Sequence, residues 1–147
     1  MKVKGQSSDT MASHCAQSYG PYIVVHGGSR LPFGTTTRQS LFAFDTRSRK
    51  WNHLDQSIAD DDCPIGLYGH SMSIIDDVLY LVGGTTGLMY YSNVYAFDLK
   101  GPPKWQQLFT VSFLHYRIIA LALYDEKNRF FSAHSLAEII ALLSVID

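Results

Sequence analysis

The stretch that decides the fold is Gly69–Gly84, GHSMSIIDDVLYLVGG, because its pattern also occurs at Ser13–Gly28, SHCAQSYGPYIVVHGG. The histidine and the glycine pair of the second copy lie 56 residues after those of the first. Further along, SLFAFD and NVYAFD match at an interval of 53 residues, and Trp51 matches Trp105 at an interval of 54. Agreement among these separate positions indicates an internal repeat of about 54 residues.

Each repeat reads as four short strands. In the second repeat we expect them at Ser71–Ile75, Val78–Val82, Asn93–Leu99 and Lys104–Leu108, with a tight turn between the first two at Asp76-Asp77. The apolar run Val78–Val82 is typical of a strand buried on both faces. The glycine pair then ends that strand, where a side chain would obstruct close packing or a positive φ. Four antiparallel strands of this kind describe one blade of a β-propeller.

The pattern of His, apolar run, Gly-Gly, aromatic strand and Trp resembles the kelch repeat. The segments Gly27–Gly34, GGSRLPFG, and Tyr68–Gly87 also resemble a subfamily of kelch proteins. The fold implied is all-β, with two four-stranded antiparallel kelch-type propeller blades, an incomplete third and a short C-terminal helix. The positions that carry the resemblance, and to which we assign structural rather than metal-binding roles, are His14, Gly27, Gly28, Trp51, His70, Gly83, Gly84 and Trp105. We expect His14 and His70 to share one structural role, such as a bond to a neighbouring backbone group, and Trp51 and Trp105 to be core residues.

A third repeat begins but does not continue. Ile119 stands where the repeat has His, no Gly-Gly follows Phe130-Phe131, and Ser135 with Glu138 forms a capping-box pattern for a short apolar helix. Repeat units generally need three or more neighbours, so we expect a truncated form or fragment of a longer propeller. The expected organisation is an N-terminal tail or end of a preceding blade at 1–12, repeat 1 at 13–54, an inter-blade loop at 55–67, repeat 2 at 68–108, a degenerate repeat 3 at 109–134 and a helix at 135–147.

Composition excludes several classes of protein. The 147 residues are 46% hydrophobic and 17% charged, with a net charge of −1, which fits a globular chain rather than a disordered one. This balance gives no reason to expect nucleic acid or an anionic membrane as a partner. The N-terminus has no apolar signal region, no run is long enough to span a bilayer, and Cys15 and Cys63 form no disulfide framework. We therefore expect a cytoplasmic or nuclear location, with both thiols reduced.

The candidate partner-binding residues lie in the loops after the second strand of each repeat. Arg30 and Arg38 could grip a peptide carboxylate by paired hydrogen bonds, and Phe33, Tyr90 and Tyr91 could supply contact area. The alternative for each is a solvated side chain or one packed on its own loop, and Asp60–Asp62 reads as a solvated loop. The sequence shows no nucleophile with a base, no paired carboxylates and no metal-ligand spacing, so we expect neither an enzyme nor a cofactor.

The subfamily resemblance implies a substrate receptor of a cullin-2 RING E3 ubiquitin ligase. Such a receptor reads target tails with its propeller and binds elongin B and C through a C-terminal BC-box, while other subunits carry out the ubiquitin chemistry. The tail SLAEIIALLSV has the Ser-Leu start of that box but departs from it at Ile140 and Ser144. Two alternatives remain: a kelch scaffold or adaptor in cytoskeletal or signalling assemblies, and a non-functional fragment.

Overall fold

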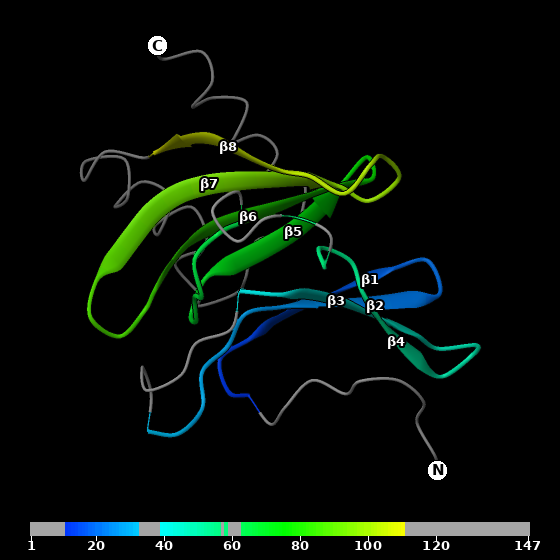
Figure 1. The fold of residues 1–147 in the computed structure, drawn as a ribbon, viewed down its shortest axis with the longest axis horizontal. Helices are drawn as coiled ribbons and strands as arrows, with labels where there is room; N and C mark the ends of the chain where they lie inside the picture. The colour runs from blue at the N-terminus through cyan, green and yellow to red at the C-terminus, as the bar shows by residue number, and fades with distance from the viewer. Residues whose placement is uncertain (1–10, 33–38, 57, 59–62, 111–147) are drawn as a thin grey trace, which may run out of the picture.

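The computed structural model describes residues 11–32, 39–56, 58 and 63–110, which form two four-stranded antiparallel sheets. The strands of each sheet are hydrogen-bonded in chain order (Figure 1). The first sheet contains β1 (Cys15–Tyr19), β2 (Tyr22–His26), β3 (Leu41–Asp45) and β4 (Lys50–His53); the second contains β5 (Ser71–Ile75), β6 (Val78–Thr85), β7 (Tyr90–Asp98) and β8 (Trp105–Thr110). We call these sheets the first and second blades. The two predicted blades are thus confirmed, whereas residues 111–147, including the predicted third repeat and helix, lie outside the described residues.

The second blade differs from expectation around its glycine pair. Strand β6 continues through Gly83 and Gly84 to Thr85, instead of ending at Val82, and its register against β7 shifts between Val82 and Gly84. Both glycines have positive φ, of 66° and 107°, so they form an irregularity within the strand. Because the pairing continues, β7 also begins earlier than expected, at Tyr90 instead of Asn93. In the first blade, by contrast, β2 ends at His26, directly before its glycine pair.

Burial in β6 also departs from the prediction. Leu79 and Leu81 are fully buried, whereas the alternate residues Val78 and Tyr80 are only half-buried. The strand therefore presents one well-buried face and one less covered face, as alternation of side chains across a sheet requires. The expectation of a strand buried on both faces holds only for its last part, where Val82 is buried beside Leu81.

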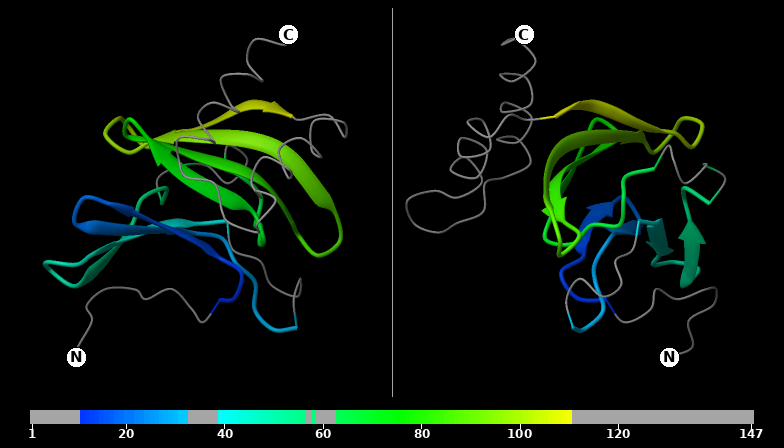
Figure 2. Two further views of the ribbon diagram at one scale, coloured as in Figure 1. Left: turned by 180° about the vertical axis from the view of Figure 1, so that it is seen from behind. Right: turned by 60° about the vertical axis from the view of Figure 1, so that its left-hand side comes forward.

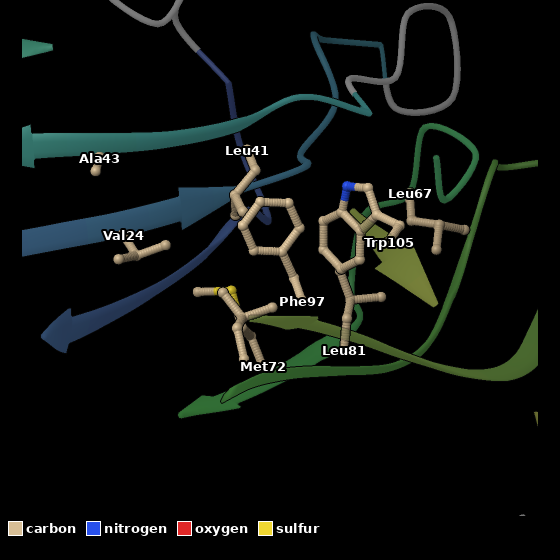
Figure 3. Packing of buried hydrophobic residues seen from close by; sticks show 9 residues of the cluster. Val24, Leu41, Ala43, Leu67, Met72, Leu81, Phe97 and Trp105 are labelled. Carbon is tan, nitrogen blue, oxygen red and sulfur yellow. The ribbon is translucent and has the colours of Figure 1, made fainter. Parts of the chain in front are cut away.

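The hydrophobic core lies between the two blades, which stack one above the other (Figure 2 and Figure 3). Alternation along β3 points Leu41 and Ala43 into this interface. Trp105 is 3% exposed and packs at 5.0 Å from the ring of Phe97, which confirms its predicted core position. The core residues are Val24, Leu41, Ala43, Leu67, Met72, Leu79, Leu81, Phe97 and Trp105.

Trp51 does not share the environment of its repeat counterpart Trp105. It is half-buried and packs against Phe42 and Phe44, with the Phe44 ring 5.1 Å away. Because Phe42 and Phe44 alternate with the core residues of β3, this aromatic group lies on the face of the first blade that points away from the second. The prediction that Trp51 is a core residue is therefore correct only for packing within its own blade.

Polar contacts join β1 of the first blade to β5 of the second. The thiol of Cys15 donates to the carbonyl of His70 over 2.7 Å, and the amide of Gln17 donates to the carbonyl of Met72 over 3.2 Å. At the far end of β1, the hydroxyl of Tyr19 donates to Asp77 over 2.6 Å. Burial raises the pKa of Cys15 to about 11, so this thiol stays protonated at neutral pH and serves the interface.

The described residues form no helix that is long and apolar enough to cross a bilayer.

Candidate protein-binding loops and the interface that holds them

Three connections lie at the same end of the two blades. In an antiparallel sheet with strands in chain order, successive connections alternate between its two ends. The connections β2–β3 and β6–β7 therefore lie at the ends where β1 and β5 begin. Because β1 runs beside β5 in the same direction, with Cys15 bonded to His70 and Tyr19 to Asp77, these two ends coincide and include the β4–β5 connection; we call them the loop end. In Figure 1 the described part of the β2–β3 connection and the β6–β7 loop both lie on the left of the molecule. Loops carried by rigid strands in this way are common positions for binding residues.

The β6–β7 loop is held in shape by two threonine hydroxyls. The hydroxyl of Thr85 donates to the carbonyl of Met89 over 2.7 Å and accepts from the backbone N–H of Gly87 over 2.9 Å. The hydroxyl of Thr86 accepts from the N–H of Met89 over 3.3 Å, and the N–H of Thr86 donates to the carbonyl of Met89 over 3.2 Å. Such contacts fix a short loop in the way that a backbone turn does. The loop therefore presents its side chains on an ordered frame.

The structure places the predicted binding residues unequally. Arg30 is exposed in the β2–β3 connection, and Tyr90 is 85% exposed where β7 begins. Tyr91 is half-buried and packs against the core, so it offers a partner less surface than Tyr90 does. Phe33 and Arg38 lie outside the described residues. The roles of these five residues in binding stay predictions.

Two histidines are buried together where the blades meet. His26 of β2 is 0% exposed and His70, just before β5, is 5% exposed, and their Nδ1 and Nε2 atoms are 3.2 Å apart. The other nitrogen of His26, Nε2, lies 3.0 Å from the carbonyl of Gln39. Because a carbonyl only accepts, His26 Nε2 carries the proton, and His70 Nε2–H donates to His26 Nδ1. The remaining nitrogen, His70 Nδ1, is then an unprotonated acceptor, and it makes no hydrogen bond.

His14 and His70 occupy equivalent positions in the repeat but do different things. His14 is exposed, and its Nδ1 lies 3.2 Å from the carbonyl of Met11, which is the backbone contact that we expected of both. His70 instead bonds the side chain of His26 across the interface. The expected backbone contact is therefore found for His14 and not for His70, because only His70 is covered by a neighbouring blade within the described residues.

Burial keeps the histidine pair neutral. It lowers the pKa of His26 to about 3, with repulsion from His70 as the next cause. It lowers the pKa of His70 to about 4, with repulsion from His14 next. Two neutral rings that share one hydrogen bond are suited to holding the blades together at neutral pH. They are not suited to proton transfer with a substrate, because both side chains are buried.

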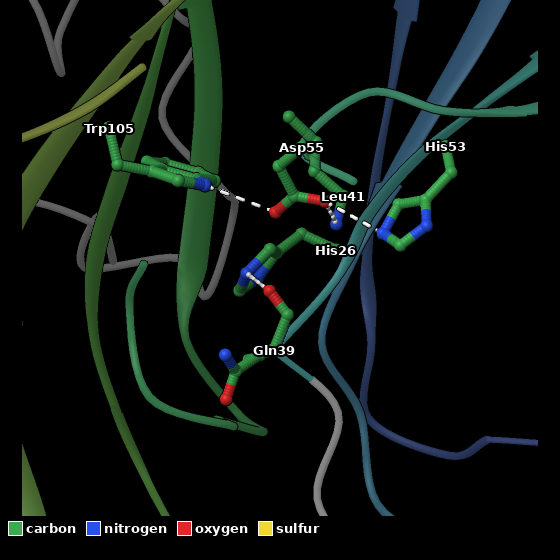
Figure 4. A network of polar contacts seen from close by, with 6 residues as sticks. All are labelled: His26, Gln39, Leu41, His53, Asp55 and Trp105. Carbon is green, nitrogen blue, oxygen red and sulfur yellow. Dashed lines mark hydrogen bonds and ion pairs between the residues drawn. The ribbon is translucent and has the colours of Figure 1, made fainter. Parts of the chain in front are cut away.

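Asp55 links both blades at the start of the inter-blade connection (Figure 4). It is 4% exposed, and its carboxylate accepts from the N–H of Leu41 over 2.9 Å and from Nε1 of Trp105 over 3.1 Å. Nε2 of His53 lies 3.0 Å from the same carboxylate. Sequence reasoning did not identify this residue. The available signal was the buried indole N–H of Trp105, which needs an acceptor in any core.

The glycine pairs allow the blades and their histidines to come close. A β-carbon at Gly27 would lie 2.4 Å from both the carbonyl of Leu67 and Cε1 of His70. A β-carbon at Gly84 would lie 2.9 Å from Cβ of His70. All four glycines of the two pairs have positive φ. Both predicted reasons for the glycines, close packing and positive φ, are thus confirmed.

The buried polar side chains of His26, His70 and Asp55 lie at the interface between the two blades. Within the described ranges, no group of three or more His, Cys, Asp or Glu side chains is arranged to hold a metal ion. His26, His70 and Asp55 have little contact with solvent, so none is placed to act on a substrate at the surface. This arrangement can hold two blades rigidly and present the loop end.

Stability is expected to fall as pH decreases from about 6.5 towards about 4. In this window the unfolded chain takes up protons at both histidines while the folded chain does not, which favours unfolding. Each histidine contributes at most about 1.4 kcal/mol per pH unit, and the effect is absent above about pH 6.5. Urea unfolding at several pH values checks this.

The matched variant is His70→Gln, whose side-chain amide can still donate to His26 but does not titrate. It is expected to show about half of the histidine-dependent slope. The difference between the two pH slopes isolates the contribution of His70. Equal pH slopes for the variant and the unmodified protein would contradict the assignment.

Comparison with known proteins identifies the repeat. The Kelch motif family model matches residues 66–102. Kelch domain-containing protein 10 of Xenopus laevis is 31% identical over 108 residues, covering 74% of this chain and 25% of the relative, and the Homo sapiens protein is 30% identical over the same length, with 24% of it covered. Tip elongation aberrant protein 3 of Schizosaccharomyces pombe is 27% identical over 103 residues, covering 67% of this chain and 9% of that protein.

A solved structure, "Structure of YjhT", matches the fold with a TM-score of 0.60 at 17% identity, covering 77% of this chain and 40% of that one. The chain spans about a quarter of the length of the kelch domain-containing protein 10 sequences that it matches. Its two blades share their pattern of strands, histidine and glycine pair with one another, and the family model falls on the second of them. The chain is therefore a kelch-repeat protein of the β-propeller type, similar in sequence to kelch domain-containing protein 10.

Proposed function

We propose that this chain is a non-catalytic protein-interaction module that binds partners at its loop end. The observation that carries the proposal is the position of the exposed apolar side chains. Among the described residues six large apolar side chains are exposed, and five of them lie at the loop end: Leu31, Ile65, Leu88 and Met89 in its connections, and Tyr90 at the start of β7. Apolar side chains gathered at one end of a soluble domain are typical of an interaction surface.

The rigid interface behind the loop end supports the same proposal. Gly28 N–H donates to the carbonyl of Leu67 over 2.8 Å, and Gly69 N–H donates to the carbonyl of Ser13 over 3.1 Å. The first bond ties the start of the β2–β3 connection to the β4–β5 connection, and the second ties the end of the β4–β5 connection to the segment before β1. A binding site built from loops with fixed relative positions loses less conformational entropy when a partner binds.

The test of this coarse proposal is selection of displayed random peptides on the immobilised chain. We expect peptides to be enriched relative to an unrelated immobilised protein of similar size. Addition of the soluble chain should release them, because they occupy a specific site. If no peptide is enriched, the interaction-module proposal is wrong.

A finer proposal follows from the similarity to kelch domain-containing protein 10. We propose that the whole protein is the substrate receptor of a cullin-2 RING E3 ubiquitin ligase in the cytoplasm or nucleus, with its propeller recruiting the target and elongin B and C linking it to cullin-2. It rests on the subfamily resemblance of Gly27–Gly34 and Tyr68–Gly87 and on identity over 74% of the chain.

Co-purification tests the finer proposal. The tagged full-length protein is expected to retain elongin B, elongin C and cullin-2 after purification from cells. If these three proteins are absent while peptide binding is intact, the ligase-receptor proposal is wrong, and a kelch scaffold or adaptor of cytoskeletal or signalling assemblies takes its place.

A further inference from the structure

The tip of the β6–β7 loop exposes three consecutive large apolar side chains. Leu88 is 93% exposed, Met89 is 61% exposed and Tyr90 is 85% exposed. Their neighbours in sequence, Thr85 and Thr86, fix the loop through their hydroxyls. We call Leu88, Met89 and Tyr90 the apolar tip. Single exposed apolar residues need no explanation, but three in a row on an ordered loop do.

The exposure of the apolar tip is not a by-product of folding. The next residue, Tyr91, packs against the core and pairs with Gly84, and Tyr90 pairs with Thr85 at the end of the ladder. The hairpin would close equally well with polar residues at 88 and 89, since the bonds that shape it use backbone groups and threonine hydroxyls. The apolar side chains of Leu88 and Met89 are therefore not needed to form this hairpin.

Charge around the apolar tip narrows the class of partner. From Thr85 to Asn93 the sequence carries no charged residue. Among the described residues of the loop end, Arg30 is a single exposed cation and belongs to no lysine or arginine cluster. An anionic membrane or an acidic peptide would be attracted by lysine and arginine clusters, which this loop lacks. Leu, Met and Tyr instead offer adaptable apolar area with a polar hydroxyl, as protein-binding surfaces do.

We propose that the apolar tip is the main anchor of the partner site and that it binds a protein segment through large aliphatic or aromatic side chains. This inference rests on the proposed interaction function and makes it specific. The expectation from sequence combined arginines that grip a peptide carboxylate with aromatic contact area, and it did not include Leu88 or Met89. Leu31, which is 73% exposed in the β2–β3 connection, extends the apolar surface at the same end.

The test uses the random displayed peptides described above and two variants of the full chain. The double variant Leu88→Ser, Met89→Ser removes the centre of the apolar tip. The matched control is Ile23→Thr, which removes a 40% exposed apolar side chain from β2, away from the loops. Peptides selected on the unmodified protein are expected to be rich in large apolar residues and to bind the double variant at least about tenfold more weakly, as loss of an anchor side chain predicts. The control should bind them unchanged.

The outcomes separate this inference from the function on which it rests. If peptides are selected but bind the double variant equally well, or share a required terminal carboxylate instead of apolar residues, the inference is wrong and the interaction function stands. If no peptide is selected, the function itself fails. Binding of the apolar tip to phosphatidylcholine vesicles would show that its partner is a membrane, and the inference would be overturned. A dimer in sedimentation that the double variant abolishes would show that its partner is a second copy of the chain, which would also overturn the inference. Unchanged thermal unfolding of the double variant excludes a folding defect.

Discussion

Replacing Asp55 with alanine is expected to lower the free energy of unfolding by about 3 kcal/mol or more. The carboxylate is 4% exposed and accepts from the N–H of Leu41 and from Nε1 of Trp105, both of which are buried. Alanine leaves these two donors without an acceptor, and each buried donor without a partner costs about 1–3 kcal/mol. The third contact, from His53, costs less because that side chain is 27% exposed and water can replace the carboxylate.

Urea unfolding followed by tryptophan fluorescence measures this effect, since Trp105 itself contacts Asp55. Asp55→Asn keeps an acceptor oxygen, so its free energy of unfolding is expected to lie between those of the alanine variant and the unmodified protein. Asp98→Ala is the matched control: Asp98 also accepts two hydrogen bonds, from the N–H groups of Lys100 and Gly101, but it is exposed. Water replaces that acceptor, so little stability should be lost. Comparable losses for Asp55→Ala and Asp98→Ala would show that Asp55 does not join the blades.

The repeat explains why the blades could be predicted and Asp55 could not. The strands follow from the match between two copies of one pattern, and each copy supports the reading of the other. Asp55 lies one residue beyond the matched Leu54, and the residue 54 positions later is Phe109, so the repeat gives no sign of a carboxylate there. Its role comes from a contact between the blades, with Trp105, which lies 50 residues further along the chain. The repeat period carries no information about such a contact.

The histidines show a second limit. Repeat equivalence predicts equal roles for His14 and His70, yet their burial differs: the first blade covers His70, whereas no blade among the described residues covers His14. His26, which has no histidine counterpart at Val82, is the actual partner of His70. Position in the repeat thus predicts the backbone of a blade, whereas the environment of a side chain depends on which blades surround it.

The loops illustrate the same difference for the candidate site. Charge and aromatic content marked Arg30, Tyr90 and Tyr91 as candidates, but alternation along β7 turns Tyr91 towards the core and leaves Tyr90 outside. The sequence predicts that this strand begins only at Asn93, and it therefore places both tyrosines in the loop. Leu88 and Met89 were not singled out, since an apolar pair in a short loop reads equally well as packed or exposed.

Replacing Gly27 with alanine is expected to destabilise the protein by about 3 kcal/mol, through two effects that can be separated. At φ of 70° an alanine costs about 1–2 kcal/mol in backbone strain. In addition, its β-carbon would lie 2.4 Å from the carbonyl oxygen of Leu67 and from Cε1 of His70, closer than atoms approach without movement. The histidine ring could rotate, but the Leu67 carbonyl belongs to the backbone. Moving it would break its hydrogen bond from Gly28 N–H, which is 2.8 Å long and joins the two blades.

Gly20→Ala isolates the first effect. Gly20 has a φ of 54°, similar to that of Gly27, but a β-carbon there would meet nothing within 4 Å. It should therefore cost only the backbone strain, about 1–2 kcal/mol in urea unfolding. The difference between the two variants measures the clash with the second blade. Adding His70→Ala to Gly27→Ala should recover little of this difference, because the Leu67 carbonyl still obstructs the β-carbon. If the two glycine variants lose equal stability, the close approach of the blades does not depend on the missing side chain at Gly27, and positive φ alone accounts for the glycine.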